Sequence, residues 1–87
     1  MSPRPPQGQD ERDLEHYQEL VTRGEIARQR RDDVAFRLWT DQGMTQKEIA
    51  ERLDRADRRA GGDGVAHGSV QKLLFRLRKA REKQLLA

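Results

Sequence analysis

The residues with the most evident chemical potential lie between positions 67 and 84, where cations recur at helical spacing. Lys72, Arg76 and Lys79 are separated by four and three residues, so on a helix they share one side. Apolar residues at i, i+3, i+4 and i+7 from Val70 occupy the opposite side. Guanidinium and ammonium groups aligned in this way attract phosphate and form hydrogen bonds with base edges. The pattern therefore predicts an amphipathic helix with a face that suits a polyanion.

The element before this helix has a locally specified start. Thr45 and Glu48 form a capping-box pattern, in which the hydroxyl accepts from the Glu48 amide and the carboxylate reaches back to the Thr45 amide. A helix is therefore expected to begin at Gln46. Apolar residues at i, i+4, i+7 and i+11 from Ile49, together with acid-before-base pairs at i,i+4, favour its continuation to Ala60.

A glycine-rich turn, GGDGVAH, separates the two helices at residues 61–67. It lacks the GK[ST] of a phosphate-binding P-loop and no strand pattern precedes it, so we expect a flexible or hairpin-like turn and not a nucleotide site. Two short helices joined by a turn, the second of them cationic, are the pattern of a helix-turn-helix.

These segments also resemble a known family. TQKEIAERL followed by HGSVQKLL is similar to the DNA-binding helix-turn-helix of bacterial regulators, and RRDDVAFRLWTDQGM resembles its supporting first helix, so that the resemblance covers about residues 30–84, with the helix-turn-helix core at about 31–84. In the compact motif, the helix that begins at Gln46 would end near Asp54, and the alanine and valine of the two helices would stand ten positions apart. The corresponding residues here, Ala50 and Val70, stand twenty positions apart. Such an enlarged turn is similar to the DNA-binding domains of large serine recombinases. LFRLRKARE with GSV resembles the promoter-reading region 4 of sigma factors.

The resemblance and the side-chain chemistry together predict the contacts with DNA. The N-terminal part of the second helix is expected to enter the major groove, where Gln pairs with adenine and Arg or Lys with guanine. The candidates for base edges are His67, Ser69, Gln71, Lys72 and Arg76. The candidates for phosphates, which fix position without reading sequence, are Thr45, Gln46, Lys47, Arg55, Arg58, Arg59, Gly68, Arg78, Lys79, Arg81 and Lys83.

One aromatic residue does not fit the apolar side of this helix. Phe75 falls on the outer side, among the cations. An outward phenyl group is suited to a thymine methyl, to the N-terminal helix or to another subunit, and the sequence leaves these three open.

Composition restricts the class of protein. The chain has 87 residues, enough for one small domain, and 38% of them are charged. It has no cysteine and only two histidines, so we expect neither a disulfide nor a metal site, and no cofactor. No apolar run approaches the roughly 20 residues that cross a membrane, and no signal-peptide pattern is present, so a cytoplasmic protein is expected. No nucleophile, base and acid are grouped, so we expect no enzyme.

Charge is distributed unevenly along the chain. Residues 1–33 carry six arginines against eight acids, a balance of −2. Residues 65–87 carry six cations against one acid, a balance of +5. The positive charge is therefore concentrated in the segment that is expected to form the second helix of the motif, where it would attract phosphate whatever the base sequence.

The N-terminal third supplies the supporting elements. Residues 1–9 are expected to be a flexible arm, and 10–87 a single helical domain. A helix is expected over Asp10–Thr22, and its apolar stripe must be covered either by the same domain or by a second subunit. A homodimer would form through Leu14, Tyr17 and Val21, or through Leu85 and Leu86 at the other end.

The next helix is expected over Glu25–Gln42, with Gly43 as its stop. Its broad apolar face would include Ile26, and Trp39 is expected to be a core or interface aromatic. Phe36 falls off this face, where it would pack on the N-terminal helix.

The sequence thus predicts an all-α bundle of about four helices that contains a helix-turn-helix with an enlarged turn. The predicted function is sequence-specific binding of double-stranded DNA, as in a small bacterial or phage transcriptional regulator. Two alternatives remain open: a protein-interaction module that binds RNA polymerase or another regulator, and an accessory factor in recombination or plasmid partition.

Overall fold

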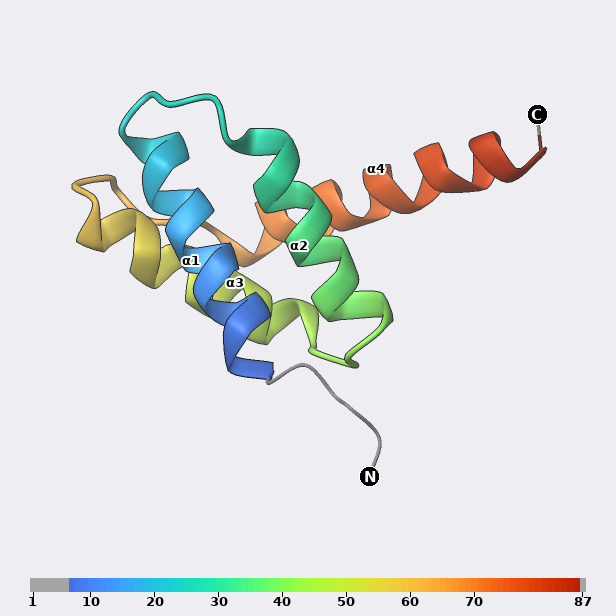
Figure 1. Ribbon diagram of the computed structural model, residues 1–87, viewed down its shortest axis with the longest axis horizontal. Coiled ribbons are helices and arrows are strands. Elements are labelled where there is room, and N and C mark those ends of the chain that lie inside the picture. Colours follow the sequence, from blue (N-terminus) through green and yellow to red (C-terminus); the bar gives the residue numbers. More distant parts are fainter. Residues whose placement is uncertain (1–6, 87) are drawn as a thin grey trace.

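The computed structural model describes residues 7–86, and the side chains from Gly8 to Leu85. Within this range the chain is entirely helical, with α1 (Gln7–Thr22), α2 (Arg28–Thr40), α3 (Gln46–Arg59) and α4 (His67–Leu86). Figure 1 shows α1 and α2 side by side in opposite directions, with α3 behind α1 and α4 passing behind α2 and projecting beyond it. The predicted all-α class with four helices is confirmed.

Helix α1 begins at Gln7, three residues earlier than expected. The prediction of a flexible arm as far as Gln9 was therefore wrong for its last three residues, and residues 1–6 lie outside the described range. Two contacts explain the earlier start. The Gln9 amide donates to Asp13 at 3.0 Å, and Asp10 accepts from Arg37 on α2 at 3.0 Å, so the first turn of α1 is fixed to a neighbouring helix.

Helix α2 begins at Arg28, three residues later than predicted. The chain turns back at Gly24, which has a positive φ of 87°, and the Glu25 amide donates to the Leu20 carbonyl at 2.9 Å. These residues therefore serve the reversal of the chain and are not free to start a helix. The prediction that Ile26 faces the core was wrong, because its side chain is fully exposed, while Ala27 is 4% exposed.

Helix α3 begins at Gln46, as predicted, and Thr45 and Glu48 form both halves of the capping box. It ends at Arg59 with Ala60 as the C-cap residue, so the longer of the two helix lengths is the observed one. An apolar side and an N-terminal cap are enough to specify this helix locally.

The core lies where the four helices meet. Its buried members are Leu14, Val34, Ala35, Leu38, Ile49, Ala50, Leu53, Val70 and Leu74. The stripe on α1 is thus covered by the same chain. A dimer contact through Leu14 is excluded in this fold because that side chain has no exposed surface, while Tyr17 and Val21 are half-buried.

Helix α4 packs on the core through its first half only. Val70 and Leu74 are buried, Leu73 and Leu77 are half-buried, and every described side chain from position 78 to 85 is exposed. No helix within the described residues is both long enough and apolar enough to cross a membrane.

Phe36 on α2 is 8% exposed, and its ring contacts α4. Its ring meets the Trp39 ring edge-on at 6.0 Å between centroids, and the Arg81 guanidinium of α4 lies 4.4 Å from its centroid. The expected partner of Phe36 was α1; its aromatic neighbour belongs to α2 and its cationic neighbour to α4. A large apolar residue off the main face of α2 is thus covered by the helix that follows the turn.

Candidate nucleic-acid interface

Two carboxylates at the end of α3 hold the turn that leads into α4. Asp57 accepts hydrogen bonds from the Gly64 amide at 2.8 Å, from the buried Gln18 amide at 3.1 Å and from the Thr22 hydroxyl. Asp54 accepts from the Val65 amide at 2.9 Å. The turn is therefore anchored to α3, and through Asp57 to α1, so the start of α4 has a fixed position.

These hydrogen bonds shift the titration of both acids. The Thr22 hydroxyl holds the pKa of Asp57 below its usual range, with further contributions from the Gly64 amide and the Gln18 side chain. The Val65 amide lowers the pKa of Asp54, and the Arg58 side chain acts in the same direction. Each group is favoured in its ionised form because donors surround the carboxylate. Both carboxylates are therefore ionised in the folded protein at neutral pH, and they hold the turn in this form.

The side of α4 that points away from the core carries four cations around one phenyl ring. Lys72, Phe75, Arg76, Lys79 and Lys83, together with Ala80, line one shallow hollow, and we call these five named residues the outer face of α4. All five side chains are exposed. Among the described residues none of the four cations lies within ion-pair distance of a carboxylate. Their charge is therefore available to an external anion.

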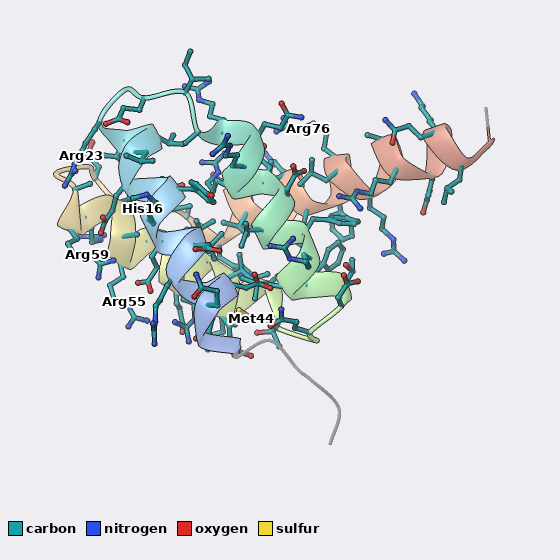
Figure 2. All side chains as sticks on the ribbon, in the orientation of Figure 1. His16, Arg23, Met44, Arg55, Arg59 and Arg76 are labelled. Carbon is teal, nitrogen blue, oxygen red and sulfur yellow. The ribbon has the colours of Figure 1, made fainter. Side chains whose placement is uncertain are left out.

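Arginines on α3 have a different environment. Arg58 pairs with Asp54 at 3.2 Å, and Arg59 pairs with Glu15 and Glu19 on α1 at 3.3 and 2.5 Å. Figure 2 places Arg55 and Arg59 at the end of the molecule beside α1, and Arg76 on the opposite side beyond α2. Two of the α3 arginines that were predicted to bind phosphate are thus paired with acids of α1 and α3, and Arg58 lies beside Gly64 in the turn before α4.

Two arginines of α4 lie along its seam with α2. The Arg78 guanidinium lies 5.8 Å from the Trp39 ring centroid and 3.7 Å from the Glu82 carboxylate. Arg81 covers the Phe36 ring and reaches Asp33 at 4.0 Å. Both were predicted to bind phosphate, and the structure uses both to cover aromatic rings at the edge of the core. They are more than half exposed, so their charge still adds to the field around α4.

Some of the groups at the start of α3 that were predicted to bind phosphate form hydrogen bonds within the helix itself. The Thr45 hydroxyl accepts from the Glu48 amide at 3.1 Å, and the Glu48 carboxylate lies where an anion would meet the first turn. Gln46 is half-buried. Lys47 is exposed and lines a second hollow with His67, beside the carboxylates of Glu51 and Asp54. Negative charge at this end makes it a weaker anion site than the outer face.

The five candidates for base edges are all exposed, but they do not share one side of α4. At about 100° per residue, Ser69, Lys72 and Arg76 lie within about 60° of one another. His67 and Gln71 project about 100° or more from Lys72. Gly68, predicted to approach phosphate, has open space where a Cβ would stand, so the surrounding chain does not require glycine there.

Phe75 is the residue of this interface that the sequence singled out without assigning it a contact. Phe75 is 45% exposed, and the Trp39 ring meets its ring edge-on at 6.2 Å between centroids. The signal available in the sequence was an aromatic residue on the cationic side of an amphipathic helix. Its partner Trp39 comes from another helix, which local spacing does not reveal.

No protein-family model, no curated protein and no solved structure matches this chain.

Proposed function

We propose that this protein binds double-stranded DNA in a sequence-specific manner, with the outer face of α4 in the major groove, and that it acts as a small transcriptional regulator. The observation that supports this most is the cationic outer face of α4, in which four cations that have no carboxylate partner in the described part of the chain surround an exposed ring. Unpaired cations on one helix face attract a polyanion and release its counterions on binding.

The dimensions of this face suit a groove. An α-helix rises about 1.5 Å per residue, so Lys72 and Lys79 stand about 10.5 Å apart along the axis, which corresponds to about three base pairs of duplex at about 3.4 Å each. A helix with its side chains fits the width of the major groove, and its lysines and arginines suit guanine edges. The residues assigned to base edges are Ser69, Lys72 and Arg76, and Lys79 and Lys83 are assigned to phosphates.

The helix-turn-helix with an enlarged turn belongs to this proposal. In it, α3 is the first helix of the motif and α4 the reading helix, with α2 as support. The anchoring of the turn by Asp54 and Asp57 favours this assignment, because a reading helix requires a fixed angle to the helix before it. The same surface would serve an accessory factor in recombination or plasmid partition, and the recognised sequence distinguishes these roles.

The test is binding of the purified protein to a pool of random duplexes, measured by fluorescence anisotropy over a salt series, followed by selection and sequencing of the bound fraction. The proposal expects affinity that falls steeply with salt and an enriched sequence motif. Binding without any enriched motif would leave only a non-specific DNA-binding protein. No binding at low salt would reject the proposal and favour the RNA-polymerase alternative, for which a polymerase pull-down resistant to nuclease is the direct measurement.

Arg76→Ala is the informative variant, with Arg23→Ala as its matched control. Both side chains are exposed and neither forms an ion pair within the described residues, and Figure 2 shows Arg23 at the left edge of the molecule and Arg76 away from it, near the upper part of α2. The two variants lose the same charge. Only Arg76→Ala is expected to change the preference for the selected motif.

A further inference from the structure

An exposed phenyl ring lies amid cations on the outer face of α4. The large apolar side chains that are exposed in the described part of the chain are Ile26, Phe75 and Leu85. Of these, Phe75 alone lies on the outer face of α4, next to Lys72 and Arg76. A partner that complements this surface presents negative charge and, within it, an apolar group.

The ring of Phe75 is held from behind by a series of aromatic side chains. Trp39 meets it at 6.2 Å with an interplanar angle of 87°, and Phe36 meets Trp39 at 6.0 Å and 78°. Phe36 is 92% buried, since 8% of its surface is exposed. Edge-to-face pairs of this kind favour one ring orientation. The exposed part of Phe75 is therefore presented in a fixed position, which a contact with a small group requires.

The major groove offers one apolar group on its base edges, the C5 methyl of thymine, within a wall of phosphates. We propose that Phe75 is a specificity-determining residue that recognises a thymine methyl group. This inference rests on the proposed function, because it assumes that the outer face of α4 enters the major groove. It assigns to Phe75 a role that the surrounding cations do not have, since they recognise charge and guanine edges.

Deoxyuridine provides a test that changes one methyl group and nothing else. In the duplex selected from the random pool, each thymine is replaced singly by deoxyuridine, and binding of the unaltered protein is measured at constant salt. At the position that Phe75 contacts, the substitution is expected to weaken binding about three- to fivefold, the factor that corresponds to one buried methyl group. No effect at any thymine would overturn the inference while leaving sequence-specific binding established.

Variants of Phe75 connect the effect to this side chain. Phe75→Ala is expected to bind thymine and deoxyuridine duplexes equally, and Phe75→Leu, which keeps an apolar group and serves if the alanine variant does not fold, is expected to retain part of the preference. Ile26→Ala removes an exposed apolar side chain elsewhere and is expected to retain all of it. An unchanged preference in both Phe75 variants would overturn the inference. The inference would also be overturned if the unaltered protein had no preference for thymine and Phe75→Ala weakened binding of both duplexes equally. Phe75 would then act as a wedge between bases. Failure of selection to yield any motif would instead reject the proposed function.

Discussion

Replacing Lys79 and Lys83 together by alanine tests the outer face of α4 most directly. Both lysines are exposed, neither has a carboxylate partner among the described residues, and they lie one helical turn apart on a part of α4 that does not contribute to the core. The fold is therefore expected to tolerate both changes. Their loss should act on DNA binding through phosphate contacts alone.

The magnitude follows from counterion release. Each phosphate that a protein neutralises contributes about 0.9 to the slope of log affinity against log salt concentration, so the double variant should have a slope smaller by about 1.8. When salt rises from about 50 to about 200 mM, the unaltered protein should then lose about 12-fold more affinity than the variant. Because phosphates carry no sequence information, the difference should be equal for selected and random duplexes.

The assay is fluorescence anisotropy at four or more salt concentrations, with Arg12→Ala plus Arg23→Ala as the matched control. This control removes the same charge from exposed positions on α1 and directly after it, and α1 makes no contact with α4 in the described structure. Its slope is expected to stay close to that of the unaltered protein. Equal slopes for the two double variants would refute the reasoning, because binding would then depend on net charge and not on the outer face.

Four further outcomes are expected. Arg76→Ala should reduce discrimination between selected and random duplexes by about 1–3 kcal/mol in anisotropy titrations, and equal weakening on both would make Arg76 a phosphate contact. Asp57→Ala should lower the free energy of unfolding in urea by about 1–3 kcal/mol, because the buried Gln18 amide loses its acceptor, and an unchanged midpoint would contradict this. Because the pKa values of Asp54 and Asp57 are lowered on folding, their contribution to stability is complete above the unfolded-state pKa of about 3.9 and is lost as pH falls through the lower folded values. Melting temperatures should therefore fall less steeply in acid for Asp57→Ala than for the unaltered chain, and parallel curves would argue against the carboxylate contacts. Leu74→Ala should cost about 2–5 kcal/mol in urea unfolding, since its side chain is fully buried, and a cost below about 1 kcal/mol would contradict its place in the core.

Local patterns in the sequence predicted the second half of the fold closely. The start of α3 at Gln46 follows from a capping box whose two members are three residues apart. The start of α4 at His67 follows from the glycines of the turn and the return of apolar spacing at Val70. These signals succeed because both partners of each interaction lie within a few residues of each other.

Contacts between distant segments were not predictable in the same way. Spacing along α3 suggests that Arg59 is an unpaired cation at the end of a helix. Its partners are Glu19 and Glu15, which lie 40 and 44 positions earlier in the sequence. Phe36 was expected to pack on α1, and spacing along α2 did not reveal that the Arg81 guanidinium of α4 lies over its ring. Helical spacing predicts which residues share the outer face of α4. The ion pairs of Arg59 could not be predicted in this way, because they depend on how α1 crosses α3.

The lack of contact between α1 and α4 has an electrostatic consequence. Helix α1 carries five acids against one arginine and α4 carries six cations against one acid, so these opposite charges lie on two helices that do not touch. The molecule therefore has a dipole moment directed toward α4. If the protein binds DNA as proposed, the field of the polyanion would exert a torque on this dipole and turn α4 toward the duplex before contact, which would raise the fraction of productive encounters. The effect should decline as the Debye length shortens below about 10 Å, so the association rate, and not only the affinity, should depend on salt.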